Sequence, residues 1–159
     1  MSRKSLSVAL LQEKDRGSVD ANLAAIEAGL REAAANGVEL VLLQELHNGA
    51  YFCQHESVDE FDRAEPIPGP STDRLGTLAK ELKLVIVASL FERRAAGLYH
   101  NTAVVFERDG SIAGKYRKMH IPDDPGFLEK FYFTPGALGF EEARSPASTA
   151  RGTVRMIRA

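Results

Sequence analysis

The fold is indicated first by the stretch Val38-Glu39-Leu40-Val41-Leu42-Leu43, a nearly continuous apolar run of the kind that forms a strand covered on both faces. A similar apolar run occupies residues 7–12. Between the two runs, apolar residues recur every three or four positions over residues 19–33, which is typical of one face of a helix. Strand, helix and parallel strand form a βαβ unit, so we predict an α/β fold.

Two helices are predicted with definite ends. The first begins at Ser18 or Asp20, either of which can act as the N-cap, and ends at Asn36-Gly37. The second covers residues 71–82, with Ser71 as its N-cap and apolar residues at helical spacing behind it.

Three further strands are predicted at residues 84–90, 101–106 and 112–116. A turn over residues 92–97 separates the first two. Asp109-Gly110 is a strong hairpin signal between the last two.

Two segments lack any regular apolar spacing and are predicted to be long loops, residues 46–70 and 118–136. The first of them includes a short helix around residues 58–63. After residue 140 the composition changes to arginine, alanine, serine and threonine with few large apolar side chains. We therefore predict one folded unit over residues 1–140 and an atypical tail over residues 141–159.

Composition excludes several classes of protein. Of the 159 residues, 44% are hydrophobic and 26% are charged, values typical of a globular domain. The net charge of −2 provides no basic surface for nucleic acid or anionic lipid, so neither is expected as a partner. A single cysteine excludes an internal disulfide framework and fits a reducing compartment. No apolar stretch is long enough to span a bilayer, and we expect a cytoplasmic protein.

Three charged residues are candidates for chemistry. Glu45 directly follows the strand residues Val41-Leu42-Leu43-Gln44, and open α/β sheets bind ligands at the carboxyl ends of their strands. Lys118 follows the strand at 112–116, where its charge could stabilise an oxyanion or simply face solvent. Glu129 lies among aromatic residues, and a carboxylate enclosed there needs a partner, for which a lysine is suited. Without further information, Glu45 could equally cap a turn or pair with a lysine.

A metal site is not predicted. His47, His55 and Glu56 could be considered as ligands, but their spacing differs from the paired spacing of structural zinc sites, and Cys53 has no CxxC partner. No nucleotide-binding, serine-hydrolase or zinc-protease motif is present in the sequence, and we expect no cofactor.

The candidate residues lie in segments that together resemble the carbon–nitrogen hydrolase (nitrilase) superfamily, and within it the branch of N-carbamoylputrescine amidohydrolases. The resemblance covers about residues 6–140. It rests on Leu42-Leu43-Gln44-Glu45-Leu46-His47-Asn48, Tyr51-Phe52-Cys53-Gln54, Asn101-Thr102-Ala103-Val104-Val105, Asp109-Gly110, Gly114-Lys115-Tyr116-Arg117-Lys118-Met119-His120-Ile121-Pro122-Asp123-Asp124-Pro125 and Glu129-Lys130-Phe131-Tyr132-Phe133-Thr134-Pro135-Gly136.

The resemblance implies a fold and a set of roles. The fold would be a four-layer α-β-β-α sandwich of the nitrilase type, of which this chain supplies the N-terminal portion only. Glu45 would be the general base, Lys118 would stabilise the tetrahedral oxyanion, and Glu129 would position Lys118 and the substrate. The implied reaction converts N-carbamoylputrescine and water to putrescine, carbon dioxide and ammonia, without a metal or organic cofactor, in an enzyme that is a homo-oligomer.

One feature of the family pattern is missing. The family's nucleophilic cysteine lies in an elbow beyond the Phe-Thr-Pro-Gly loop, and this sequence has no cysteine after Cys53. Cys53 itself belongs to the Tyr-Phe-Cys-Gln loop, which is not the nucleophile motif. We therefore expect a family member truncated after about Phe140, inactive on its own and prone to self-association, with a tail that derives from a shifted reading frame.

Two alternative functions remain open from the sequence. One is a catalytically dead binding or assembly module that retains Glu45, Lys118 and the Tyr51-Phe52 loop. The other is a generic α/β hydrolase in which Glu45 and Glu129 form an acid/base pair in one cleft, without Lys118 between them.

Overall fold

A computed structural model describes residues 6–137, 139, 142–144 and 153–155 of the chain. The elements are β1 (Val8–Leu11), α1 (Val19–Ala35), β2 (Leu40–Leu43), the 3-10 helix η1 (Val58–Arg63), α2 (Pro70–Leu82), β3 (Val85–Ala95), β4 (Leu98–Phe106), β5 (Ile112–Arg117), α3 (Glu129–Tyr132), β6 (Glu142–Arg144) and β7 (Thr153–Arg155). The predicted α/β class is confirmed. None of the helices in the described ranges is long and apolar enough to cross a membrane.

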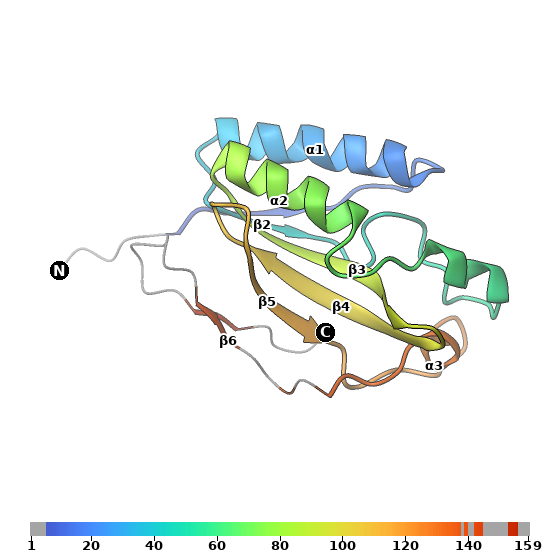
Figure 1. The fold of residues 1–159 in the computed structure, drawn as a ribbon. Coiled ribbons are helices and arrows are strands. Elements are labelled where there is room, and N and C mark those ends of the chain that lie inside the picture. The colour runs from blue at the N-terminus through green and yellow to red at the C-terminus, as the bar shows by residue number, and fades with distance from the viewer. Residues whose placement is uncertain (1–5, 138, 140–141, 145–152, 156–159) are drawn as a thin grey trace.

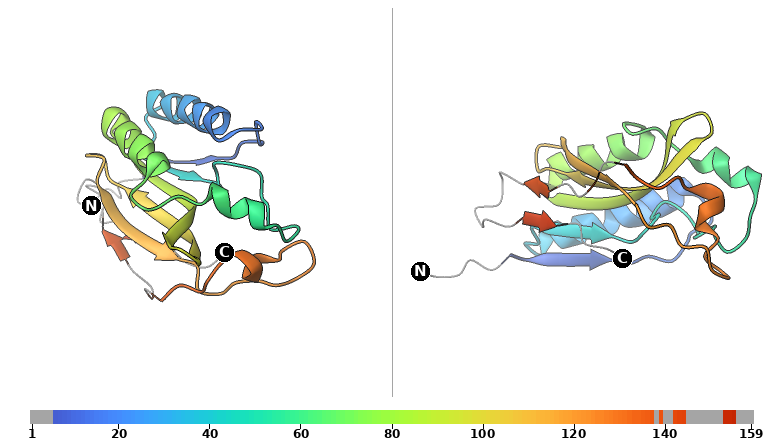
Figure 2. Two further views of the ribbon diagram at one scale, coloured as in Figure 1. Left: turned by 45° about the vertical axis from the view of Figure 1, so that its right-hand side comes forward. Right: turned by 90° about the horizontal axis from the view of Figure 1, so that it is seen from below.

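The central feature is a mixed five-stranded sheet in the order β1-β2-β3-β4-β5. The first three strands are parallel, as the βαβ pattern predicts, and β3, β4 and β5 are joined by antiparallel pairing. Helices α1 and α2 lie side by side over one face of this sheet (Figure 1). Seen from the opposite side, the strands lie in front of both helices (Figure 2, right).

The packing between helices and sheet follows from the alternation of side chains along each strand. Val41 and Leu43 of β2 are buried against the helices, together with Ile26 and Leu30 of α1. The opposite face of the sheet is open to solvent at β1 and β2, where the exposed fraction of Leu10 is 76%. The prediction that these two strands are covered on both faces is therefore wrong for the described residues, because helices cover only one side of the sheet.

The helix ends were predicted with mixed success. Ser18 is the N-cap of α1, and its side chain accepts a hydrogen bond from the backbone N–H of Ala21, as predicted. The N-cap of α2 is Gly69 rather than Ser71. Ser71 lies in the first turn and donates its hydroxyl to Glu65 Oε1 at 2.7 Å, so a more distant carboxylate uses the side chain that was predicted to cap the helix.

The strands β3 and β4 are longer than predicted, so the turn expected over residues 92–97 is confirmed only at residues 96–97, and residues 92–95 belong to β3. Glu92 continues β3 and is buried, because Arg117 binds both of its carboxylate oxygens at 2.6 and 2.7 Å. Thr102 adds a hydrogen bond of 2.6 Å to the same carboxylate. A charged residue that resembles a turn residue in the sequence is thus accommodated inside the sheet by two partners, Thr102 on the adjacent strand β4 and Arg117 on β5 beyond it. The predicted Asp109-Gly110 turn does connect β4 to β5.

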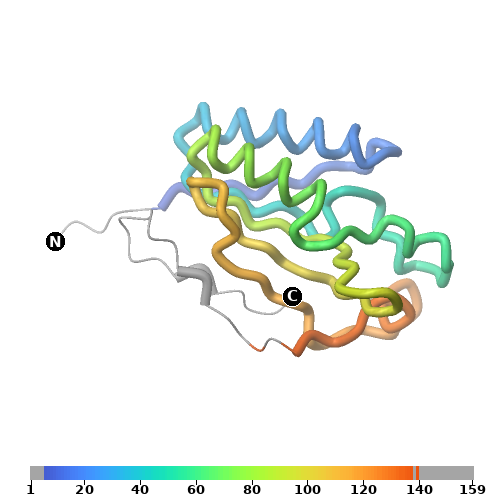
Figure 3. Tube along the Cα trace, viewed as in Figure 1, coloured from blue at the N-terminus to red at the C-terminus, as the bar shows by residue number. Residues whose placement is uncertain are grey.

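The two segments predicted as loops meet at one end of the sheet (Figure 3). The short helix predicted near residues 58–63 is confirmed as η1, whereas α3 was not predicted. Aromatic side chains from both segments and from β3 pack together there, among them Phe52, Phe91, Tyr132 and Phe133. This cluster holds the loops against the carboxyl end of the sheet.

The predicted tail, residues 141–159, is described only in part. Strands β6 and β7 form an antiparallel pair within it, and the rest of the tail lies outside the described residues. The separate assignment of this segment stays a prediction.

Candidate active site

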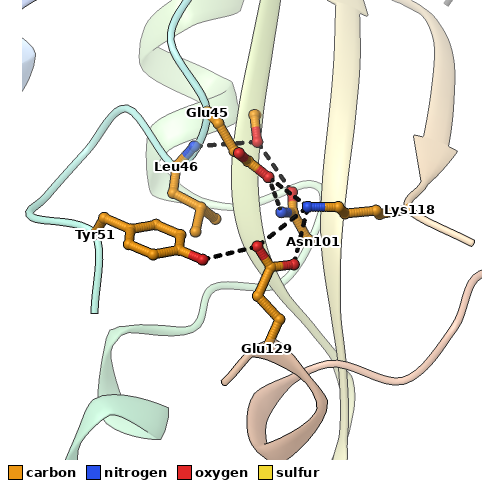
Figure 4. A network of polar contacts seen from close by, with 7 residues as sticks. Glu45, Leu46, Tyr51, Asn101, Lys118 and Glu129 are labelled. Atoms are coloured by element: carbon orange, nitrogen blue, oxygen red, sulfur yellow. Dashed lines mark hydrogen bonds and ion pairs between the residues drawn. The ribbon is translucent and has the colours of Figure 1, made fainter. Parts of the chain in front are cut away.

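Glu45, Lys118 and Glu129 come together in space (Figure 4). Lys118 Nζ lies 3.0 Å from Glu45 Oε1 and 2.9 and 3.1 Å from the two carboxylate oxygens of Glu129. One ammonium therefore bridges two carboxylates that are 84 positions apart in the sequence (129 − 45). All three residues predicted from the sequence are in the same cluster.

The sheet topology explains why these residues meet. Glu45 follows the end of β2 and Lys118 follows the end of β5, and both strands end at the same edge of the sheet. The backbone N–H of Lys118 donates to the carbonyl of Asn101 at 2.9 Å, which extends the pairing of β4 with β5 by one residue. Arg117 is opposite Thr102 in the register, on the sheet face that carries Val104, so the next residue, Lys118, points to the other face of the sheet.

Glu129 is the first residue of α3 and its side chain is only 2% exposed. The Tyr51 hydroxyl donates a hydrogen bond to its Oε1 at 2.9 Å. Burial, and then the charge and hydrogen bond of Glu129, raise the pKa of Tyr51, so this hydroxyl stays a donor. The buried Glu129 carboxylate thus has the hydrogen-bond donors, Tyr51 and Lys118, that a carboxylate enclosed by aromatic residues requires.

The ammonium of Lys118 remains charged in this cluster. Burial by itself lowers the pKa of Lys118, but the hydrogen bonds and charges of Glu129 and Glu45 outweigh this effect and raise it above its ordinary value. A fixed positive charge held by two carboxylates is suited to stabilising a developing oxyanion.

An open cavity of about 760 Å³ lies over these groups. Its walls include Glu45, Lys118 and Glu129, with Tyr51 and Phe127 among the aromatic residues. The Glu45 side chain is 44% exposed, in contrast to Glu129. The cavity combines apolar walls with a few convergent polar groups, as small-molecule sites do.

Comparison with known proteins gives the family. A family model described as carbon–nitrogen hydrolase matches residues 7–156. The chain belongs to the carbon–nitrogen hydrolase family. It is 44% identical over 140 residues to the N-carbamoylputrescine amidase of Arabidopsis thaliana, which covers 87% of this chain and 46% of the plant protein. It is 39% identical over 137 residues to a citrullinase of Francisella tularensis, which covers 86% of this chain and 48% of that protein.

Solved structures agree with this assignment. A carbon–nitrogen hydrolase from Helicobacter pylori has a TM-score of 0.85 to this chain at 49% sequence identity, over 89% of this chain and 48% of that one. The chain thus spans about half the length of these carbon–nitrogen hydrolases. The predicted resemblance to the family is confirmed.

Cys53 does not join the charged cluster as a reactive thiol. It is buried among the aromatic residues. Burial, and then the charge of Glu129, raise the pKa of the Cys53 thiol to about 12. A thiol in that state is protonated near neutral pH and is a poor nucleophile.

The residues considered for a metal site do not gather. His47 is buried and its Nδ1 lies 2.8 Å from the carbonyl of Ser89, while His55 is exposed. Within the part of the chain that the structure describes, no group of three or more His, Cys, Asp or Glu side chains could hold a metal ion.

The generic acid/base interpretation requires Glu45 and Glu129 to share a cleft without Lys118 between them. Lys118 Nζ lies within hydrogen-bonding distance of both carboxylates, so that geometry is not present.

Sequence reasoning missed two polar residues of the site. Asn101 donates from Nδ2 to Glu45 Oε1 at 2.6 Å, and Ser89 donates its hydroxyl to Asn101 Oδ1 at 3.1 Å. The sequence placed Asn101 at the start of a predicted strand and in a segment that resembles the family, but indicated no role for its side chain. The available signal was an amide side chain at the start of a buried strand, since buried polar groups require partners.

Proposed function

We propose that this chain carries the general base, the oxyanion-stabilising lysine and the accessory carboxylate of an amidohydrolase that cleaves a carbamoyl amine. The supporting observation is the position of Lys118 Nζ, 3.0 Å from Glu45 Oε1 and 2.9 Å from Glu129 Oε2. N-carbamoylputrescine is the proposed substrate, with putrescine, carbon dioxide and ammonia as products. The similarity to plant N-carbamoylputrescine amidases supports this choice within the family.

In this proposal Glu45 takes the proton of a cysteine thiol, and the thiolate attacks the carbamoyl carbon. Negative charge develops on the carbonyl oxygen, where Lys118 stabilises it. The carbon–nitrogen bond then breaks and Glu45 returns the proton to the leaving nitrogen. Glu45 next activates a water molecule that hydrolyses the thioester-type intermediate to the free thiol and a carbamic acid. The carbamic acid loses carbon dioxide and so releases the second amine. Glu129 holds Lys118 in place throughout.

The thiol in this sequence of steps is not Cys53, whose thiol is buried and protonated near neutral pH. The family places its nucleophile in an elbow that this sequence does not contain. We therefore expect the 159-residue chain to bind the substrate without turning it over, while the intact enzyme would be a homo-oligomer.

Two measurements on the purified chain test the proposal. The first is ammonia release from N-carbamoylputrescine, where we expect no turnover. Ammonia release that Glu45→Gln abolishes would contradict the expected inactivity.

The second measurement is substrate binding, followed through the backbone NMR signals of residues around the cavity. We expect binding to weaken in Glu129→Gln and to persist in Glu39→Gln, a carboxylate in a peripheral ion pair with Arg108. Absence of binding contradicts the proposed substrate class.

A catalytically dead binding or assembly module is the second candidate. The observation in its favour is that the three charged groups are in place while the only thiol of the sequence is buried. An electrophilic amide distinguishes the two. Stoichiometric labelling of Cys53 accompanied by turnover favours an unorthodox enzyme, and binding without labelling favours the module.

A further inference from the structure

The backbone immediately after Glu45 is held in an unusual conformation. Leu46 has a φ of +50°, in the left-handed region that a bulky residue rarely adopts. Its side chain is buried in the aromatic cluster. Such conformations persist where surrounding contacts over-determine them, and they concentrate at functional sites.

The contacts that hold this turn come from Ser89 of β3. The backbone N–H of Leu46 donates to Ser89 Oγ at 3.1 Å. The imidazole of His47 makes a 2.8 Å hydrogen bond from Nδ1 to the carbonyl oxygen of Ser89. Because a carbonyl oxygen only accepts, Nδ1 carries the proton. One serine therefore binds both of the residues that follow Glu45.

The Ser89 hydroxyl connects this turn to Asn101. Ser89 Oγ accepts from the backbone N–H of Leu46, which leaves its own proton free to donate to Asn101 Oδ1 at 3.1 Å. Since Oδ1 of Asn101 is thereby the acceptor, Nδ2 must face Glu45 as a donor, at 2.6 Å from Oε1. Figure 4 shows this chain of contacts converging on Glu45.

We propose that Ser89 and Asn101 are positioning residues, which fix the Glu45 carboxylate as a hydrogen-bond acceptor beside Lys118. Both groups that reach Oε1, the Asn101 amide and the Lys118 ammonium, are donors, and both favour the carboxylate form. Among the described residues no hydrogen bond reaches Oε2 of Glu45, so this oxygen is left for a ligand in the cavity. This chain of hydrogen bonds from Leu46 through Ser89 and Asn101 to Glu45, called the relay below, is formed without any ligand.

This proposal rests on the proposed function only in taking Glu45 as the general base. The relay itself is a property of the chain without substrate, so it can be tested apart from turnover. A chain that keeps the relay but fails to bind N-carbamoylputrescine contradicts the proposed function alone. A chain that binds the substrate without the relay contradicts this inference alone.

The test is the scalar coupling across the hydrogen bond from Asn101 Nδ2 to the carboxyl carbon of Glu45, measured by NMR on the labelled 159-residue chain. We expect the coupling in the unmodified chain, its loss in Ser89→Ala, and its return in Ser89→Thr, which restores a hydroxyl. Thr102→Val is the matched control, because it removes a buried hydroxyl hydrogen bond from the neighbouring position of β4 on the opposite face of the sheet. The coupling is expected to persist in that variant.

Backbone spectra of each variant show whether it is folded. Absence of the coupling in the folded, unmodified chain overturns the proposal, as does a coupling of unchanged size in Ser89→Ala. If Ser89→Ala fails to fold, Ser89→Thr decides the question, because only a hydroxyl in the Ser89 position can preserve the direction of the relay. Loss of the coupling in a folded Ser89→Thr that keeps its hydrogen bond to Leu46 also overturns it.

Discussion

Removal of the Arg117 guanidinium is expected to destabilise the chain strongly, although Arg117 lies outside the cavity. Its side chain is 8% exposed and makes a two-pronged ion pair with Glu92, which is 3% exposed. Arg117→Met leaves a buried carboxylate without its countercharge, and breaking such a pair costs about 3–5 kcal/mol. That is a large share of the roughly 5–15 kcal/mol by which a typical domain is stable.

Urea unfolding followed by circular dichroism measures this loss. Arg108→Met is the matched control, because Arg108 pairs with Glu39 nearer the surface, where an ion pair contributes about 0–1 kcal/mol. Combining Arg117→Met with Glu92→Leu removes both charges, and we expect it to recover most of the lost stability. A loss for Arg117→Met no greater than for Arg108→Met refutes the reasoning.

The same pair determines a dependence on pH. Burial raises the pKa of Glu92, but the hydrogen bonds from Arg117 and Thr102 outweigh it and leave the pKa below its ordinary value. The ion pair therefore stabilises the fold fully above the unfolded-state pKa, and the contribution is lost as the pH falls through the folded-state pKa. We expect the difference in unfolding free energy between the unmodified chain and Arg117→Met to shrink in acid. A difference that grows on acidification contradicts this assignment.

Three further outcomes are expected. Cys53, with its pKa raised to about 12, should react far more slowly with a disulfide reagent at pH 8 in the folded chain than in urea, and equal rates contradict its burial. Leu10→Lys should reduce self-association in sedimentation experiments, because Leu10 is 76% exposed on the uncovered sheet face. Val58→Lys, at a 72% exposed position of η1, should leave self-association unchanged. A monomeric unmodified chain, or a Leu10→Lys variant that associates as strongly as the unmodified chain, contradicts this prediction. Gly76→Ala should lower the urea midpoint despite the higher helix propensity of alanine, because its Cβ would lie 2.8 Å from the carbonyl oxygen of Gly110, and a higher midpoint shows that the two segments can separate.

Local spacing in the sequence was sufficient to predict most of the elements. The apolar stripe of α1, the run at Leu40–Leu43 and the Asp109-Gly110 turn each depend on residues a few positions apart. The structure differs from the prediction where a residue has a partner outside the regular apolar spacing. The Ser71 hydroxyl bonds Glu65 in the preceding loop instead of capping α2, and Glu92 stays in β3 because its ion pair is formed with Arg117 of β5.

The candidate site likewise contains residues that local spacing predicts and residues that it does not. Glu45 and Lys118 could be found because each follows an apolar strand, and a carboxylate enclosed by aromatic residues indicated Glu129. The parts played by Ser89 and Asn101 depend on the register of β3 with β4 and on the turn at Leu46. Neither is encoded in local spacing, so the relay could be seen only in the folded chain.

The contacts among Glu45, Lys118 and Glu129 join segments that are brought together only when β2, β5 and α3 are all in place. A compound held by all three groups would have no comparable affinity for the unfolded polypeptide. By thermodynamic linkage, such a compound at a hundred times its dissociation constant would raise the unfolding free energy by about 2.7 kcal/mol. Thermal melting in the presence of candidate amides can therefore rank ligands of this chain even if no bond is ever cleaved.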